Sequence, residues 1–285
     1  MTLHPPRSFP GSLLERYGTR LDRIGNAIRP LGDRLGPGPL KDFLSGTWLG
    51  HPLHPVLTDV VIGSWNGALM LDVLGGPSAH GASDALVGIG VLSAGPTALA
   101  GWSDWNDTEG DERRLGLVHA LGNTVVLAMF AGSWVARRRG HRALGVGLST
   151  AGMGLAAGTA WLGGHLIYDQ GVGVDNTAFD RLPSGYVDVM NLDDLPDGQP
   201  TVVQVEGTPV FLLRRGEDVV ALHNACTHRG GPLNEGSVEG DTVTCPWHGS
   251  TFRLADGEIE RGPATVPQPR YAVRVQQGSV QVRAA

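Results

Sequence analysis

Two short segments near the C-terminal end of the chain combine cysteine with histidine. The first contains Cys226 and His228, and the second contains Cys245 and His248. Thiolates are soft anionic donors that suit ferric iron, whereas two neutral imidazoles on a second iron leave less negative charge and raise the reduction potential. One cysteine and one histidine in each segment therefore predict a two-iron, two-sulfide cluster with four protein ligands.

A zinc site and a disulfide are the alternatives for these residues. Zinc fingers usually take two cysteines from one turn and two histidines from a helix. Here each segment mixes the two residue types and no helix-like pattern follows. A disulfide would leave both histidines and the neighbouring glycines without a role, so the cluster is the interpretation we favour.

The residues beside these four are expected to shape the loops around the cluster. Glycines allow tight turns and a close approach of the backbone, and backbone amides there can donate to the sulfides and raise the potential. This surrounding shell comprises Arg229, Gly230, Gly231, Trp247, Gly249, Ser250 and Pro263.

Residues 186–285, which carry these segments, have the pattern of an all-β domain. Strand-like runs at 210–213 and 219–223 flank a turn, and Asp-Gly and Gln-Gly pairs at 256–257 and 277–278 mark further turns. No amphipathic segment of helix length interrupts them. A small β-sandwich or barrel is expected.

Four apolar segments precede this domain. Three of them contain no Asp, Glu, Lys or Arg, and the other is interrupted only by two aspartates, Asp59 and Asp72; the segments are 51–75, 85–103, 115–136 and 143–168. A membrane helix needs about 20 mostly apolar residues, and a soluble bundle would need polar stripes at helical spacing. The segments therefore predict a four-helix membrane bundle.

The remaining segments precede or connect these two domains. Residues 1–50 carry an apolar heptad pattern that predicts an amphipathic helix, which would lie on the membrane surface or the soluble domain, or pair with a partner subunit. The expected organisation is an amphipathic N-terminal segment (1–50), a membrane domain (51–168), a linker (169–185) and an all-β domain (186–285).

Ionisable residues also occur in the membrane half. If the helices alternate in direction, one set falls on the side from which the β domain emerges: His51, His54, His119, His165 and Asp104. Such residues are costly within a membrane and are often functional. Imidazoles from different helices can bind haem b or another metal, or hydrogen-bond a quinone.

The alternative for these histidines is an interfacial role, in contact with lipid headgroups or backbone. Asp59 is a further polar anomaly that would pair with a histidine or line a proton path.

Residues 186–283 resemble a Rieske-type [2Fe-2S] domain, in both ligand segments, the strands between them and the proline-containing segment 262–264. The resemblance implies that Cys226 and Cys245 hold a buried iron and that His228 and His248 hold an exposed one.

Differences within the segments place the chain inside this family. Respiratory members carry an extra cysteine in each loop, which is missing here, so the chain resembles the ferredoxin and ring-oxygenase branch. Of two hydroxyls that raise the potential in respiratory members, Ser250 keeps one, whereas Phe252 replaces the other. We expect an intermediate potential within the range of about −150 to +300 mV.

Residues 51–175 resemble an uncharacterised four-helix membrane family. The resemblance rests on a His-Pro-x-His-Pro motif at 51–55 and a Gly-Gly-His motif at 163–165. It implies the architecture of the membrane half and no activity.

The chain as a whole is expected to be a membrane-anchored Rieske protein that carries single electrons between a reductase or quinol and an acceptor. We expect no second iron domain of the ring-oxygenase type, and no Gly-x-Gly-x-x-Gly motif is present, so no substrate-converting site is visible. The alternatives are a complete membrane redox enzyme with haem b or quinone on the membrane histidines, and a redox sensor that acts through a partner. A net charge of −6 argues against nucleic acid as a partner.

The expected location is the cell membrane, with several spans. The arginine-rich segment 137–142 favours that end of the bundle inside the cell, which would place the β domain outside. Because iron–sulfur clusters are usually inserted in the cytosol, we favour a cytoplasmic Rieske domain.

Overall fold

A computed structural model describes residues 9–181 and 183–285, which form two compact units. One unit contains the residues up to Leu35 together with Leu53–Val172, and the other contains Gly36–Pro52 together with Gly173–Ala285. The expected N-terminal segment 1–50 is therefore divided, because its helix packs on the bundle whereas residues 36–52 contact the β domain. Most of the expected linker 169–185 also belongs to the β unit.

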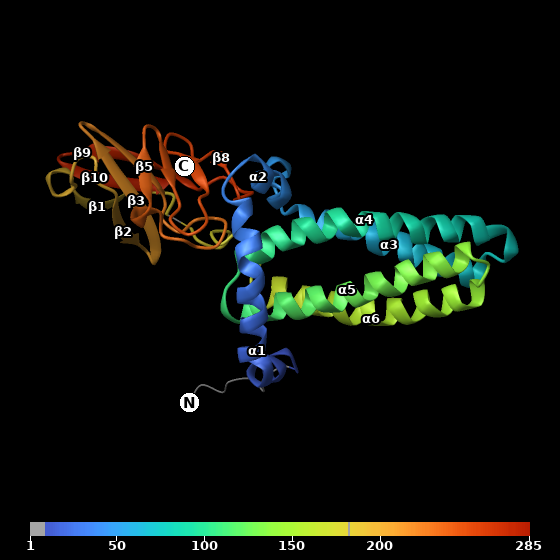
Figure 1. The fold of residues 1–285 in the computed structure, drawn as a ribbon. Helices are drawn as coiled ribbons and strands as arrows, with labels where there is room; N and C mark the ends of the chain where they lie inside the picture. The colour runs from blue at the N-terminus through green and yellow to red at the C-terminus, as the bar shows by residue number, and fades with distance from the viewer. Residues whose placement is uncertain (1–8, 182) are drawn as a thin grey trace, which may run out of the picture. The chain divides into compact units, whose positions relative to one another are not determined.

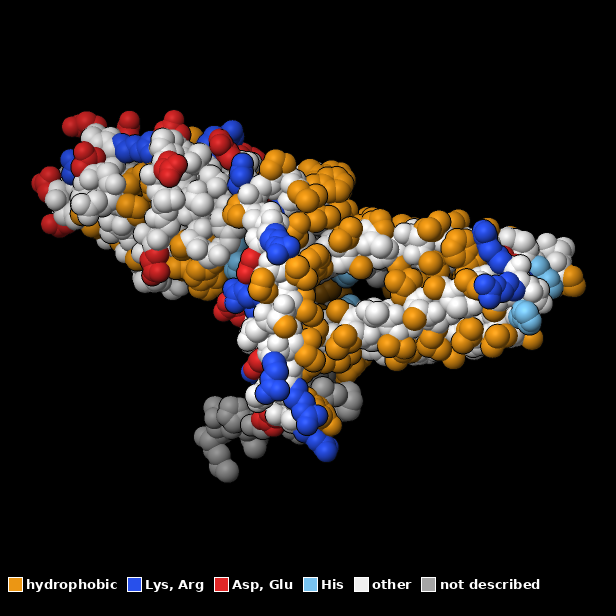
Figure 2. Space-filling model, viewed as in Figure 1, with side chains coloured by type: hydrophobic (Ala, Val, Ile, Leu, Met, Phe, Trp, Pro, Cys, Tyr) orange, Lys and Arg blue, Asp and Glu red, His pale blue; other side chains and the backbone are white. Residues whose placement is uncertain are grey.

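The first unit is built on four long helices that run side by side (Figure 1): α3 (Leu53–Leu74), α4 (His80–Asn106), α5 (Gly110–Arg138) and α6 (Arg142–Tyr168). All four are long and apolar enough to cross a membrane. Their outward faces are mostly apolar between the two ends (Figure 2), as expected where lipid replaces water. The four-helix membrane bundle predicted from the sequence is confirmed.

Helix α1 (Phe9–Gly32) packs across one end of this bundle. Its apolar stripe contributes Leu14 and Leu21, which are buried against Leu115 and Leu117 at the start of α5. The helix continues through Pro30 to Gly32. The helix therefore packs on the membrane bundle itself, which was not among the three surfaces expected for the amphipathic segment.

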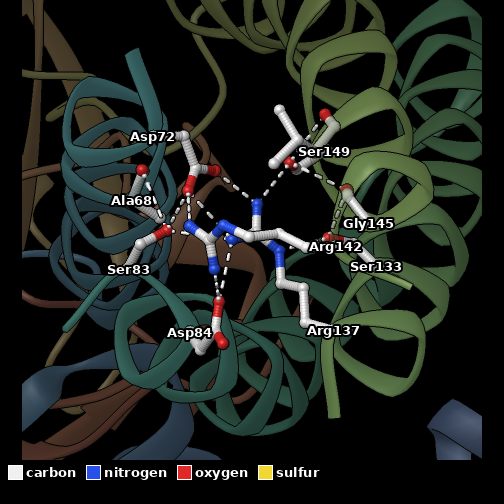
Figure 3. Close-up of polar contacts among 10 residues, drawn as sticks. Ala68, Asp72, Ser83, Asp84, Ser133, Arg137, Arg142, Gly145 and Ser149 are labelled. Atoms are coloured by element: carbon white, nitrogen blue, oxygen red, sulfur yellow. Dashed lines mark hydrogen bonds and ion pairs between the residues drawn. The ribbon is translucent and has the colours of Figure 1, made fainter. Parts of the chain in front are cut away.

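A buried polar cluster connects the helices at the other end of the bundle (Figure 3). Arg137 of α5 pairs with Asp72 of α3 and, at 3.0 Å, with Asp84 of α4. Arg142 of α6 pairs with the same two carboxylates. The side chain of Arg137 is fully buried, so this arginine belongs to the helix interior and is not one of the loop charges assumed in the orientation argument.

The second unit contains ten strands in two antiparallel sheets. One sheet has the order β1-β10-β9-β4-β3-β2 and the other β5-β6-β7-β8. The strands are β1 (Val187–Asn191), β2 (Thr201–Val205), β3 (Thr208–Arg215), β4 (Asp218–His223), β5 (Ser237–Glu239), β6 (Thr242–Thr244), β7 (Thr251–Arg253), β8 (Ile259–Arg261), β9 (Arg270–Gln276) and β10 (Ser279–Ala284). The predicted all-β domain is confirmed.

Strand β3 explains how this unit carries two cores. Val210 and Leu212 point to one face and Phe211 and Leu213 to the other, and all four are buried, because side chains alternate along a strand. One core is enclosed by the larger sheet, whose end strands β1 and β2 also contact each other. The other lies between the two sheets and includes both cysteines, so it is the core that supports the candidate site.

Candidate metal centre

Three loops of the β unit bring the candidate ligands together. The first follows β4 and contains Cys226 and His228, the second joins β6 to β7 and contains Cys245 and His248, and the third follows β8 at residues 262–269. In the first loop, the Cys226 N–H donates to the Gly231 carbonyl at 2.9 Å, and in the second the Cys245 N–H donates to the Ser250 carbonyl at 2.8 Å. Each loop is thus closed by its own backbone.

The two thiols are buried, unbridged and in direct contact. Cys226 donates to the Cys245 sulfur, and this contact lowers the pKa of Cys245 to about 7, whereas it raises the pKa of Cys226. The N–H groups of His228 and Arg229 are directed at the sulfur of Cys226, and those of Trp247 and His248 at the sulfur of Cys245. Four backbone donors therefore favour thiolates at this position.

The two imidazoles form the other half of the donor set. The rings of His228 and His248 lie 5.1 Å apart, centroid to centroid, with their planes at 87°. Burial, followed by the nearby His248, Lys41 and Arg229, holds the pKa of His228 well below its usual range. A neutral ring presents the lone pair that a metal ligand needs.

Glycine is required at one point in the first loop. A Cβ on Gly231 would lie 2.7 Å from the Cys245 sulfur and 3.1 Å from the Trp247 ring, so only glycine lets the first loop approach the second. Gly230 and Gly249 have φ angles of 74° and 79°, the left-handed region that favours glycine.

A buried amide that the sequence analysis missed supports the first loop. Gln268 donates from Nε2 to the carbonyls of His223 and Ala225, both at 2.7 Å, and its Oε1 accepts from the Thr227 N–H at 3.1 Å. His223 is itself buried and its Nε2 lies 2.9 Å from Asp180. No motif marks these residues, because they contact the loop from distant parts of the sequence.

Ser250 joins the second loop to the third. Its Oγ is fully buried and accepts from the Ala264 N–H at 3.0 Å, which leaves the hydroxyl hydrogen to be donated elsewhere. Pro263 is buried beside it after a cis peptide bond from Gly262. Phe252 is fully buried in the core between the sheets, and Trp247 is 57% exposed at the surface of the second loop.

Residues 36–52, which we call the strap, lie against the second and third loops. They contain the short helix α2 (Pro39–Ser45). The Gly262 N–H donates to Asp42 at 3.1 Å, and a Cβ on Gly249 would lie 3.0 Å from Pro37. Burial is the main reason that the pKa of Asp42 is raised. The sequence analysis assigned this segment to a separate N-terminal region and missed its place beside the centre.

The donor set fits a two-iron cluster. A pair of thiols backed by amide donors and a pair of neutral imidazoles supply two soft and two borderline ligands, which is the division that a Rieske centre uses. Within residues 9–181 and 183–285, no three His, Cys, Asp or Glu side chains converge on the position of a single metal ion. A cluster with two side chains on each iron needs no such group.

The structure separates the candidate residues of the membrane half. His54 and His119 lie inside the bundle, with their Nδ1 atoms 2.9 Å and 2.8 Å from backbone carbonyls of the neighbouring helices. His165 lies 3.3 Å from Asp169 at the end of α6. Asp59 is exposed on the outer face of α3, and His51 belongs to the β unit. Asp104 is partly buried in the last turns of α4. Of these candidates, His54 and His119 are the two that make the same contact, from Nδ1 to a backbone carbonyl of the neighbouring helix.

Comparisons with known families agree with this division into two parts. Residues 185–273 match the Rieske [2Fe-2S] domain, and residues 50–176 match a family described as a predicted membrane protein, DUF2231. The ferredoxin of carbazole 1,9a-dioxygenase from Nocardioides aromaticivorans IC177 is a solved structure with 31% identity, over 36% of this chain and 100% of that one, with a TM-score of 0.34.

Several similar sequences each match about a third of the chain. Ferredoxin CarAc of Metapseudomonas resinovorans is 34% identical over 90 residues, which are 30% of this chain and 84% of the ferredoxin. Human apoptosis-inducing factor 3 is 32% identical over 97 residues, 34% of this chain but only 16% of that protein. The cytochrome b6-f complex iron-sulfur subunit of Chlorobaculum tepidum is 30% identical over 92 residues, 32% of this chain and 50% of the subunit. The chain therefore belongs to the Rieske [2Fe-2S] family, with its Rieske domain joined to a membrane domain of the DUF2231 type.

Proposed function

We propose that the protein is a membrane-anchored carrier of single electrons, which takes them from a reductase or a quinol and passes them to an acceptor. The observation that carries the proposal is the paired donor set, with two backbone N–H groups directed at each sulfur. In this proposal Cys226 and Cys245 hold one iron and His228 and His248 hold the other.

A [2Fe-2S] cluster bound to these residues supplies reversible one-electron transfer. The residues of the chain adjust how readily this happens. Amide donors at the sulfurs, together with the hydroxyl of Ser250, stabilise the added negative charge of the reduced state and raise the potential. Relatives whose names describe ferredoxins and an iron–sulfur subunit support the role of a carrier.

We propose that the Rieske domain lies on the cytoplasmic side of the membrane. The opposing argument depends on positive charge at the far end of the bundle. Arg137 is fully buried within the bundle and pairs with Asp72, so one fewer arginine lies in the loop at that end, where positive residues favour the inside. Reporter fusions at the C-terminus test this: we expect a fluorescent-protein fusion to be active and an alkaline phosphatase fusion to be inactive.

The carrier function is tested with the full-length protein in detergent. Electron paramagnetic resonance during an anaerobic potential titration should show a reduced Rieske signal that follows a one-electron curve. The oxidised protein is then mixed with either menadiol or NADH plus a ferredoxin reductase. We expect one of these donors to reduce the cluster within seconds, and ferricyanide to reoxidise it.

The Cys226→Ser protein is the negative control and should lack the signal altogether. A full reduced signal in this variant would contradict the ligand assignment. A wild-type cluster that titrates normally but accepts electrons from neither donor would contradict the carrier function and favour the redox-sensor alternative.

A further inference from the structure

The two helical hairpins of the bundle repeat the same contact around a histidine. His54, near the start of α3, has its Nδ1 2.9 Å from the Thr97 carbonyl of α4. His119, in the first half of α5, has its Nδ1 2.8 Å from the Thr159 carbonyl of α6. The same residue types thus meet in the same way in both hairpins.

Glycines at equivalent positions complete the repeat. Four residues after each threonine stands a glycine, Gly101 in α4 and Gly163 in α6. A Cβ on Gly101 would lie 2.7 Å from the His54 ring, and one on Gly163 would lie 3.0 Å from the Cε1 of His119. Both glycines therefore let an imidazole lie close against the neighbouring helix.

Further along, the repeat places like residues in contact across the middle of the bundle. Trp65 stands eleven residues after His54, and Phe130 stands eleven after His119. The rings of Trp65 and Phe130 stack on each other at 3.8 Å, with 3° between their planes. Equivalent residues that touch each other define a pseudo-twofold axis between the hairpins, so His54 and His119 lie on opposite sides of that axis.

The hydrogen bonds fix the protonation of both rings. A carbonyl oxygen can only accept, so each Nδ1 carries the hydrogen and each Nε2 carries a lone pair. Histidine ligands of metals are commonly held in this way, by an Nδ1–H bond to a backbone carbonyl. Two neutral imidazoles, one from each hairpin, are thus prepared to bind a metal.

The number of protein ligands and the apolar surroundings of the two histidines indicate which kind of metal centre fits here. Figure 2 shows an opening between the two hairpins, with apolar walls and histidine atoms in it. No third His, Cys, Asp or Glu joins the pair among the described residues, whereas a bare zinc or copper ion takes three or four protein ligands. A porphyrin supplies four nitrogens itself and has apolar faces. We propose that His54 and His119 are the axial ligands of a haem held between the hairpins.

The two histidines differ in one neighbour. Asn123 lies 3.0 Å from the Nε2 of His119 through its Nδ2, so its amide must release this nitrogen when iron binds. The equivalent residue in the first hairpin is Thr58, whose hydroxyl donates to the backbone carbonyl of His54. The Asn123→Thr variant makes the two halves alike and is expected to bind haem more completely.

The experiment measures the haem content of the full-length protein, produced in cells supplied with a haem precursor and purified in detergent. We expect sharp bands of low-spin haem in the reduced-minus-oxidised visible spectrum, above the broad absorption of the iron–sulfur cluster. The variants His54→Asn and His119→Asn keep an amide that can donate to the threonine carbonyl but lack the Nε2 ligand. Each should lose at least ten-fold in haem per chain.

His80→Asn and His141→Asn, at the opposite end of the bundle, are the matched controls and should keep the wild-type haem content. The reduced signal of the iron–sulfur cluster, measured in the same samples, reports that the rest of the chain is intact and that this result is independent of the proposed carrier function. Wild-type protein that contains no haem and takes up none when titrated with haemin would overturn the proposal. So would equal haem content in all four variants, or bound quinone in place of haem.

Discussion

The two units of this protein hold their buried polar groups by different means. In the β unit the cysteine sulfurs are surrounded by backbone N–H groups from their own loops, and a glycine gives the loops room to meet. In the bundle, the buried charges of Arg137 and Asp72 come from separate helices and neutralise each other.

The difference has a physical origin. A loop has backbone donors to spare, whereas the interior of a helix has already committed its own. The guanidinium of Arg137 is paired instead with side chains of other helices, those of Asp72, Asp84 and Ser149. We infer that the metal centre depends most on loop shape, and the far end of the bundle on charge balance.

The largest effect is expected when the loop shape is changed. The Gly231→Ala variant places a methyl group against the Cys245 sulfur and the Trp247 ring, so the first loop must move away from the second. We expect iron and acid-labile sulfide per chain to fall at least ten-fold. Gly185→Ala, where a Cβ would meet nothing within 4 Å, is the control and should keep the full cluster content.

Charge balance is tested next. Arg137→Met leaves the buried carboxylate of Asp72 with Arg142 and the Ser83 hydroxyl as its remaining partners, and losing one side of a buried ion pair costs about 3–5 kcal/mol. We expect a loss near the lower end of that range in the free energy of unfolding in detergent. The double variant Arg137→Met with Asp72→Leu should recover most of it. If the double variant were as unstable as the single one, packing rather than charge would hold this end together.

A side chain within the loops should have a smaller effect. Ser250→Ala removes a hydroxyl whose hydrogen is available for donation. A charge-assisted hydrogen bond contributes about 1.5–3 kcal/mol, which for one electron corresponds to a fall in potential of roughly 60–130 mV. A potential titration measures this, with the exposed Ser237→Ala as control. An unchanged potential would show that the backbone donors act alone.

The smallest effect is expected at the strap. Burial raises the pKa of Asp42 in the folded protein above its ordinary value of 3.8. As the pH rises from 3.8 to this higher pKa, ionisation of Asp42 therefore destabilises the strap in its position against the loops. Asp42→Asn keeps an oxygen that can accept from Gly262 but cannot ionise. We expect this variant to be more stable than wild type by less than about 1 kcal/mol at neutral pH, and the two to be equal below pH 3.8. Thermal unfolding at a series of pH values measures the difference, and a constant difference at all pH values would contradict it.

The same contrast explains what could be predicted from the sequence. The candidate ligands lie a few residues apart in two short segments, so their spacing was enough to predict an iron–sulfur centre. The long apolar runs were likewise enough to predict the four helices. Arg137, by contrast, was interpreted as a loop charge, because its partners Asp72 and Asp84 lie more than fifty residues away. Gln268 and the strap were missed for the same reason, because each lies far from the ligand loops in the sequence or on another segment and contacts them only in the folded chain.

The repeated hairpins have a consequence for how the two halves of the bundle pair. Asp72 and Arg137 stand at equivalent positions, each eighteen residues after the histidine of its hairpin. In a symmetric dimer of identical hairpins, this position would bring two like charges together away from water, which is strongly unfavourable. In this chain the two equivalent positions carry opposite charges, aspartate in one hairpin and arginine in the other. The ion pair therefore favours pairing of the two different halves with each other over pairing of two copies of either half.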